Sequence, residues 1–355
     1  MKIEAKPPGS KKFDYVKSPL KRVSSKHKCE ICGKPDWCSY SEDGALALCM
    51  RERAGRVKEA DNGASVHVLR PNYLDRSPAK SATPIRGGGG GGSKIVEKAD
   101  EERRHSVYYF LLEECLTLNS KHGDQLLNER RLSDATIAAN LYASMPGEDS
   151  LPDVCGKLRE RFGEGLKGVP GFYRDEAGRW KMLHIGGLMI PVRDVRGRIA
   201  GLQIRPDVML ESKYIWFSTN PDKDKYADGA SSGAPLHFVK PDLAGSSGFA
   251  FITEGALKAD IISEISECAV VGIAGATTFN AETFGAELLK SVPELRRVAV
   301  ALDSDWRTKK SVRGGLKRLL LAFEKTKLKV TVLDWDADHG KGLDDYMIAA
   351  LGLAA

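Results

Sequence analysis

The C-terminal third of this chain is predicted to be an α/β domain with a mostly parallel sheet, preceded by two smaller regions. Strand-like and helix-like segments alternate after Ser247, and helices that connect strands are typical of a parallel sheet. Four of the seven cysteines fall within 21 residues near the N-terminus, which indicates a metal-held module. With 355 residues, 42% of them hydrophobic, the chain is long enough for two or three domains with their own cores.

The excess positive charge of the chain lies at its N-terminal end. The first 70 residues hold 15 Lys and Arg against 9 Asp and Glu, and this excess of six equals the net charge of the whole chain. A basic end suits contact with a polyanion such as nucleic acid, but the first 26 residues alone fit a solvated tail equally well. No apolar run is long enough for a membrane helix and no secretory signal opens the chain, so we expect a cytoplasmic protein without a membrane partner.

Composition divides the chain into five regions. A basic tail is predicted over residues 1–28 and a zinc-binding module over 29–70. A Gly-, Pro- and Ser-rich stretch predicts a flexible linker over 71–96. An α+β region is predicted over 97–246, and the α/β domain over 247–355.

The clustered cysteines predict a structural zinc site. Cys29 and Cys32 have the spacing of a zinc knuckle, and Cys38 and Cys49 can complete a tetrahedral set of four thiolates. His27 is the alternative ligand if one cysteine is not used. A bound Zn²⁺ would let so small a module fold, and clustered cysteines in the cytosol bind metal more often than they form disulfides. The remaining cysteines are predicted to be ordinary thiols: Cys115, Cys155 and Cys268.

Local signals predict the elements of the two larger regions. Helices are expected at 106–118 and 133–143, the second with Ser133 as its N-cap, and a hairpin is expected to turn at Arg196 and Gly197. The alternating strands of the α/β domain are predicted at 249–254, 268–275, 298–303 and 329–336, with helices at 256–265, 281–292 and 312–325.

Acidic residues follow several predicted strands of the α/β domain. Glu254 ends the first strand, Asp303 and Asp305 end the third, and Asp344 and Asp345 come after the last. The carboxyl ends of parallel strands meet at one edge of a sheet. Alternation along a strand would place Asp303 and Asp305 on one face, where a bound cation relieves their repulsion. We therefore expect one or two Mg²⁺ or Mn²⁺ ions at this edge.

These motifs resemble those of known families. Glu254 with Gly255, the Asp303-x-Asp305 pair and the late Asp-Asp pair resemble the Toprim domain of primases, topoisomerases and related nucleases. The resemblance narrows to bacterial-type DNA primases through three further segments: LLNERRLSDATIAANLYASMP (126–146), GGLMIPVRDVRGRIAGLQIRP (186–206) and SKYIWFS (212–218). It covers most of residues 29–350 and implies a Toprim-type sheet, preceded by an α+β primase-core subdomain and a zinc module.

The resemblance implies a DNA primase that makes short RNA primers from ribonucleoside triphosphates on a single-stranded DNA template, by metal-dependent nucleotidyl transfer. Glu254 would be the acid/base carboxylate at the Mg²⁺ or Mn²⁺ ions, which would be bound by Asp303, Asp305 and Asp344. The cations implied to hold template or nucleotide phosphates are Arg193, Arg198, Arg205 and Lys213.

The chain departs from the primase pattern at several positions. Lys258 stands where primases have an acid four residues after the motif's glutamate, and its ammonium would pair with that glutamate or contact a phosphate. Asp260 cannot replace the missing acid, because six residues along a helix turn a side chain to another direction. Gly342 and Leu343 stand where primases often have Asp-Pro, and Arg131 replaces a glycine. These departures resemble the divergent Toprim proteins of plasmids, phages and integrated elements.

Several functions stay open at this point. The chain has no P-loop ATPase motif, so a helicase is expected in trans or as a missing C-terminal part of a longer primase–helicase. The alternative to a primase is a catalytically degraded protein that binds single-stranded DNA as a replication accessory, which Lys258 and Gly342 favour. A Toprim nuclease is disfavoured because such proteins commonly carry an ATPase domain. A topoisomerase is disfavoured because nothing after residue 345 supplies a tyrosine domain.

Overall fold

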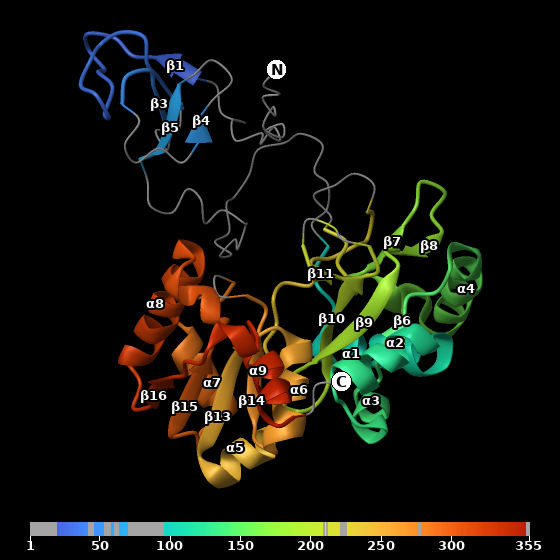
Figure 1. Cartoon of the computed structure of the whole chain (residues 1–355). Coiled ribbons are helices and arrows are strands. Elements are labelled where there is room, and N and C mark those ends of the chain that lie inside the picture. Colours follow the sequence, from blue (N-terminus) through green and yellow to red (C-terminus); the bar gives the residue numbers. More distant parts are fainter. Residues whose placement is uncertain are drawn as a thin grey trace, which may run out of the picture. The chain divides into compact units, whose positions relative to one another are not determined.

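The computed structural model describes residues 20–41, 46–52, 58–59, 64–69, 96–208, 210, 212–220, 226–275 and 278–352. The chain divides into two compact units, Met1–Gly92 and Ser93–Ala355, and each is described by itself (Figure 1). Most of the predicted basic tail and nearly all of the predicted linker over 71–96 lie outside the described residues. Within the described residues, no helix combines the length and the hydropathy needed to cross a bilayer.

The first unit is built on a small antiparallel sheet. Its strands, in sheet order, are β1 (Leu20–Arg22), β2 (Ser39–Ser41), β3 (Leu46–Cys49), β5 (Ser65–Val68) and β4 (Lys58–Glu59). Its buried cluster consists of Val23 and three cysteines, with few large aliphatic side chains beside them. So small an apolar core is typical of a module that a metal holds together.

Helices open the second unit. They are α1 (Glu101–Phe110), α2 (Ser120–Asp124), α3 (Asp134–Asn140) and α4 (Leu151–Phe162). π-Helical turns at Leu111–Cys115 and Gln125–Glu129 extend α1 and α2, and 3₁₀ turns at Glu148–Ser150 and Gly163–Leu166 flank α4. Ser133 caps α3 as predicted, because its hydroxyl accepts a hydrogen bond from the Thr136 N–H at 3.2 Å.

An antiparallel sheet follows these helices. Its strands, in sheet order, are β11 (Ile215–Trp216), β10 (Ile199–Pro206), β9 (Gly187–Arg193) and β6 (Ala143–Ser144), and a separate hairpin pairs β7 (Phe172–Arg174) with β8 (Trp180–Met182). The predicted hairpin is the β9–β10 pair. Its turn needs a glycine at Gly197, whose φ is +77°, and the Gly197 N–H donates to the Asp194 carbonyl at 3.0 Å.

A third sheet forms the C-terminal part of the second unit. Its strands, in sheet order, are β12 (His237–Val239), β14 (Val270–Ile273), β13 (Phe249–Glu254), β15 (Arg297–Ala301) and β16 (Lys329–Val332). The β14–β13, β13–β15 and β15–β16 pairs are parallel, as the alternating pattern predicts. The edge strand β12 is antiparallel to β14. It precedes residue 247, so the sheet includes a strand from the region before the predicted start of the α/β domain.

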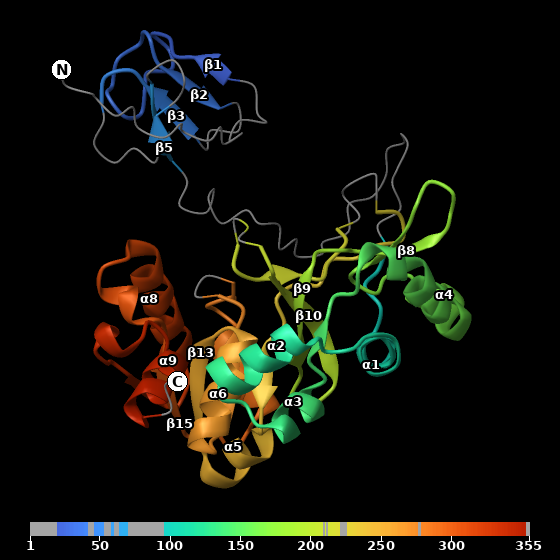
Figure 2. The ribbon, with the colours of Figure 1, turned by 45° about the vertical axis from the view of Figure 1, so that its right-hand side comes forward.

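Helices cover both faces of this sheet. They are α5 (Pro241–Ser247), α6 (Ala256–Ser266), α7 (Phe284–Ser291), α8 (Lys310–Glu324) and α9 (Leu343–Ala350). Residues of α7 and α8 pack with Ile252 and Val300 in one core cluster, whereas α6 packs on the other face through Ala259 and Ile262. Figure 2 shows this sheet and its helices on one side of the unit, with α1, α4 and the β7–β8 hairpin on the other.

Helix α6 also packs against the antiparallel sheet. Its residues Leu257 and Ile261 share a buried cluster with Leu188 and Ile190 of β9. Helix α6 therefore lies between the parallel sheet and the antiparallel sheet, and one continuous packing arrangement joins them (Figure 1).

Candidate acidic site and cysteine cluster

The four clustered cysteines come together as predicted. The sulfur atoms of Cys29, Cys32, Cys38 and Cys49 all lie within 4.8 Å of one another. Cys29 and Cys32 sit in a turn after β1, in which the Gly33 N–H donates to the Cys29 carbonyl at 2.8 Å. Cys38 lies just before β2, and Cys49 ends β3. The strand pairing thus brings distant cysteines to one point, where they form a possible zinc site.

Backbone donors surround these thiols. The N–H groups of Arg51 and Glu52 point at the Cys49 Sγ, at 3.5 and 3.3 Å. Burial opposes ionisation of Cys32, but hydrogen bonds from the Lys34 backbone and from neighbouring thiols outweigh it and lower its pKa to about 7. Burial raises the pKa of Cys38 to about 12. Four converging thiols with backbone N–H donors match the usual environment of a structural Zn²⁺ site.

Two aromatic neighbours of the cluster, His27 and Trp37, are not part of the ligand group. His27 stacks on Tyr40, with ring centroids 4.0 Å apart, and is not part of the ligand group, so the four cysteines are sufficient without it. Trp37, one residue before Cys38, does not pack against the cysteines. Its side chain is instead 73% exposed, with the Arg51 guanidinium 5.4 Å from its ring.

The predicted acidic residues lie at one end of the parallel sheet. Glu254 is the last residue of β13, and Gly255 turns the chain into α6 with a φ of +96°, which favours glycine. Strand β15 ends at Ala301, so Asp303 and Asp305 are not alternate positions of a strand as expected. They flank the start of a 3₁₀ turn at Ser304–Arg307, because the chain has already left the extended conformation.

Lysine side chains form ion pairs with the carboxylates at this edge of the sheet. Asp303 forms an ion pair with Lys258, and its other oxygen lies 2.8 Å from Lys341 Nζ. The same Lys341 ammonium lies 3.2 Å from Asp305, whose Oδ2 is also 2.7 Å from Lys309 Nζ. Asp303 and Asp305 therefore face a common cation, and that cation is a side chain. Sequence reasoning missed Lys309 and Lys341, although Lys341 stands three residues before Asp344.

Asp344 occupies the most enclosed position of the group. It lies in the first turn of α9, and its side chain is 2% exposed. A Cβ at Gly342 would overlap Asp344 Oδ1 and lie 3.0 Å from Lys258 Nζ, so the glycine makes room for both side chains. Burial raises the pKa of Asp344, and the nearby Lys258 only partly offsets this. Burial opposes the charge on Lys258, but Asp303 and Asp344 outweigh it and raise the pKa of the ammonium.

The edge only partly suits divalent metal ions. Asp344 Oδ1 and Asp305 Oδ1 are buried and accept no hydrogen bond within the described part of the chain, so they remain as possible ligand atoms. Neither carboxylate oxygen of Asp303 is free to bind a metal ion in the same way, because both contact lysines. Among the described residues, the cysteines are the only group of three or more potential ligands that converges on one point. The residues present thus fit one cation better than a pair.

Positively charged side chains lie beside the acidic residues at this edge of the sheet. Arg130 Nη1 lies 3.6 Å from Asp344 and 2.9 Å from Asp345, and it was not predicted. The Lys213 side chain reaches the surface, but the surrounding protein partly desolvates its ammonium, and this lowers the pKa of Lys213. The positive charges of Arg130, Lys258 and Arg205 lower that pKa further. Nη1 of Arg205 is buried without a hydrogen-bond partner in the described structure. Arg205 and Lys213 therefore belong to the same charged group as Asp344.

The other two predicted phosphate ligands are occupied within the fold. The guanidinium of Arg193 donates to the carbonyls of Gly197, Ala139 and Asn140 at 2.9–3.2 Å. Arg198 forms ion pairs with three carboxylates, and its side chain is 14% exposed. The partners of Arg198 are Glu101, Glu102 and Asp194. Both arginines hold the β9–β10 hairpin against the helices, through contacts with α3 and α1.

Asp260 is not part of the acidic site, as predicted, because its position on α6 turns its side chain away from Glu254. Its carboxylate accepts a hydrogen bond from the Tyr142 hydroxyl at 2.5 Å and lies 3.1 Å from His237 Nε2. The Arg193 N–H donates to the other nitrogen of this ring, His237 Nδ1, so the proton is on Nε2 and points at Asp260. This buried network ties α6 to β12 and to the segment after α3.

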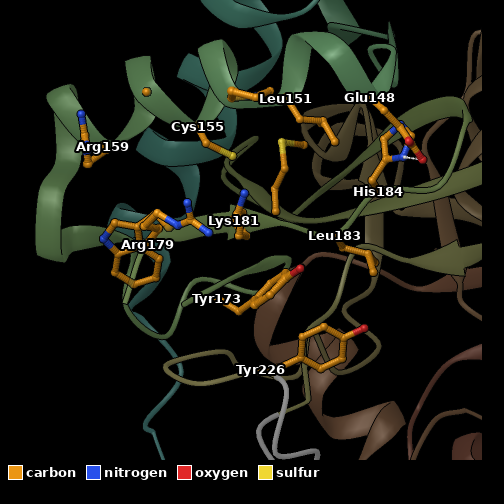
Figure 3. Close-up of a pocket in the computed structure, with 14 residues that line it drawn as sticks. Glu148, Leu151, Cys155, Arg159, Tyr173, Arg179, Lys181, Leu183, His184 and Tyr226 are labelled. Atoms are coloured by element: carbon orange, nitrogen blue, oxygen red, sulfur yellow. Dashed lines mark ion pairs between the residues drawn. The ribbon is translucent and has the colours of Figure 1, made fainter. Parts of the chain in front are cut away.

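A separate hollow of about 770 Å³ lies between α4 and the β7–β8 hairpin (Figure 3). Tyr173 and Tyr226 meet edge to face in its wall, with ring centroids 4.8 Å apart. Arg159, Arg179 and Lys181 bring positive charge to the lining of the same hollow, and none of the acidic-site residues lines it. Aromatic faces beside cations are the groups with which proteins bind single-stranded nucleic acid.

Comparisons with known proteins agree with this architecture. A family model described as a domain of unknown function, DUF3854, matches residues 249–353, which include the four predicted catalytic carboxylates. No curated protein matches the chain. The structure is similar to that of the Aquifex aeolicus primase, zinc-binding and RNA polymerase domains, at 19% identity and a TM-score of 0.53. This likeness covers 72% of the present chain and only 60% of the Aquifex chain.

A second likeness is to the RNA polymerase domain of Mycobacterium tuberculosis primase DnaG in complex with a double-stranded DNA oligomer with a 6-nucleotide overhang. It has 16% identity and a TM-score of 0.51, and it covers 72% of the present chain and 80% of the other. At such identities these likenesses establish the fold: the chain has a mixed α/β fold with several sheets, similar to that of bacterial primase cores.

Proposed function

We propose that this protein is a Toprim-type DNA primase that synthesises short RNA primers on single-stranded DNA. The observation that carries the proposal is that the carboxylates of Glu254, Asp303 and Asp344 all act on Lys258 at one end of the parallel sheet, and that further cations, Arg130 and Lys213, lie close to Asp344. Nucleotidyl transfer needs both groups: carboxylates for a divalent ion, and cations for the phosphates of the incoming nucleotide.

Each group has a distinct task in this proposal. Mg²⁺ or Mn²⁺, when bound, supplies positive charge where negative charge develops on the reacting phosphate. Glu254 would accept the proton of the attacking hydroxyl, and Asp303, Asp305 and Asp344 would provide the acidic environment of the ion. Arg205 and Lys213 would hold phosphates of the nucleotide or the template, because both lie in the charged group around Asp344.

The first unit would bind the template. Its cysteine cluster would hold one structural Zn²⁺, and the exposed Trp37 ring beside Arg51 offers a base a surface for stacking. In the second unit, the tyrosines and cations of the hollow beside α4 would offer a surface for single-stranded DNA. A helicase, in trans or in a longer form of the chain, would supply the single strand, as expected of a primase from a plasmid, phage or integrated element.

Primer synthesis tests the proposal. Full-length protein is incubated with single-stranded DNA and labelled ribonucleoside triphosphates, with Mg²⁺ or Mn²⁺ and without either. We expect short RNA products that require the metal, and we expect Glu254→Gln to lower their yield by orders of magnitude with little change in DNA binding. Asp242→Asn, at an exposed position of α5, is the matched control and should remain active. Absence of products under every metal would refute a primase.

One observation favours a second candidate, a DNA-binding accessory without catalysis. Asp303 already has a fixed side-chain cation in Lys258, as expected of a site that no longer needs metal. This reading predicts that wild-type protein binds single-stranded DNA, makes no primer, and is unaffected by Glu254→Gln. The same assay therefore separates the two functions.

A further inference from the structure

The cation nearest to Asp303 is built into the fold. Lys258 lies in the first turn of α6, and its side chain is only 14% exposed. Helix α6 cannot shift freely, because it is packed between two sheets and anchored through Asp260. The Lys258 ammonium contacts one oxygen of Asp303, and the room left by Gly342 places it beside Asp344 Oδ1. It therefore stands between two carboxylates that were predicted to bind metal.

The charges at this edge limit how many further cations can enter. Five carboxylates belong to the group: Glu254, Asp303, Asp305, Asp344 and Asp345. Four cations contact them: Arg130, Lys258, Lys309 and Lys341. The side chains of Lys309 and Lys341 are 59% and 53% exposed, so they can move away when an ion enters. Arg130 and Lys258 are 16% and 14% exposed and remain.

A pair of divalent ions would bring four positive charges to five carboxylates that already hold two fixed cations. The pair would also have to share Asp303 with Lys258, at separations where like charges repel by several kcal/mol at an effective dielectric constant of about 20. Arg205, whose Nη1 is buried in the same charged group, adds a third fixed positive charge, so one divalent ion makes the group neutral and a pair would leave it with a net charge of +2. Oxygens remain for it on Asp305 and Asp344, where they accept no hydrogen bond within the described residues.

We propose that Lys258 replaces one divalent cation, so that this site binds a single Mg²⁺ or Mn²⁺ instead of a pair. The inference rests on the proposed nucleotidyl-transfer function only for the choice of ion. An ammonium is a compact point charge with three donors, so it can neutralise Asp303 and also contact a phosphate oxygen. It cannot, however, accept additional ligands as a metal does.

Metal stoichiometry tests the inference without relying on activity. Zinc-loaded, full-length protein is titrated with Mn²⁺, and bound ion is counted by calorimetry and by the loss of the free Mn²⁺ paramagnetic resonance signal. We expect one Mn²⁺ for the wild type and two for Lys258→Glu, which supplies a carboxylate in place of the ammonium. Lys317→Glu makes the same charge change at an exposed position of α8 and should still bind one.

A second variant guards against misfolding of the glutamate form. Lys258→Met removes the charge without adding a ligand, so it should bind one Mn²⁺ at least roughly tenfold more tightly than the wild type. Two comparable Mn²⁺ sites in the wild type, or none, would overturn the inference. So would unchanged stoichiometry in folded Lys258→Glu, or unchanged affinity in Lys258→Met.

Primer synthesis in the same preparations separates this inference from the proposed function. A wild type that binds one Mn²⁺ but makes no primer contradicts the primase and supports the role of Lys258. A wild type that binds two Mn²⁺ and makes primers supports the primase and contradicts the role of Lys258.

Discussion

Replacement of Asp303 by Asn should destabilise the metal-free protein. Asp303 is 12% exposed and contacts the ammonium groups of Lys258 and Lys341, the second at 2.8 Å. Asn cannot neutralise either charge, so the substitution removes the carboxylate with which the mostly buried Lys258 forms its ion pair. The sequence pattern alone predicts the opposite sign, because two acids that end a strand without nearby lysines would repel each other, and removal of one would relieve the repulsion.

The magnitude follows from the burial of the pair. Removal of one partner from a buried ion pair costs about 3–5 kcal/mol, and the amide oxygen of Asn retains one acceptor, so we expect about 3 kcal/mol. For a unit of this size each kcal/mol lowers Tm by roughly 3 °C, which gives a loss of roughly 9 °C.

The effect should depend on pH with a defined sign. Burial opposes ionisation of Asp303, but Lys258 and Lys341 outweigh it and hold its pKa below the ordinary value. A lowered pKa in the folded state adds stability above about pH 4, the range of an unfolded Asp, and that stability is lost as the pH falls through the lowered pKa. The difference between wild type and variant should therefore be full at pH 7 and shrink in acid.

Melting curves and urea unfolding in buffer without Mg²⁺ or Mn²⁺ provide the measurement, at pH 7 and at several lower pH values. Asp338→Asn, at an exposed position, is the matched control and should melt like the wild type. An Asp303→Asn variant that melts at or above the wild-type Tm at pH 7 would show that the lysines do not stabilise this carboxylate.

Three further substitutions test other parts of the structure. Cys29→Ser should lower bound zinc from about one equivalent and lower the stability of the first unit alone, as measured by metal analysis and limited proteolysis. Arg205→Ala and Lys213→Ala should each weaken single-strand binding and reduce its salt slope by roughly one charge, whereas Arg198→Ala should lower Tm with an unchanged slope. Gly342→Ala should cost about 1–3 kcal/mol, because its Cβ overlaps Asp344 Oδ1, and it should reduce primer synthesis; a variant with wild-type Tm would contradict that contact.

Elements with local sequence signals were predicted well. The Ser133 cap, the hairpin turn at Gly197 and the parallel strands β13, β15 and β16 depend on residues close together in the chain, and all are present. The cysteine cluster was also predictable, because the spacing of metal ligands carries its own signal. Strand β12 was missed, since it is only three residues long and pairs with a strand about thirty residues away.

The charge partners at the site were not predictable. Arg130 and Asp345 lie 215 positions apart, and Lys258 and Asp303 lie 45 apart, so only the folded chain brings them together. Arg198 was predicted to be a phosphate ligand because it lies in a basic motif. In the structure it forms ion pairs with carboxylates of α1, which lie about a hundred residues earlier in the chain and could not be identified as its partners from the sequence. Sequence reasoning identified the charged residues of this region and could not assign each to a partner.

The position of α6 has a consequence for dissection of the protein. A fragment that begins at residue 247 matches the extent of the family model, but it would leave Leu257 and Ile261 without the β9 residues that cover them. It would also remove both donors from the buried Asp260 carboxylate, since Tyr142 and His237 precede the cut. The start of the family match is therefore not a boundary at which the polypeptide can be cut, and expression of this segment alone should give insoluble or partly unfolded material.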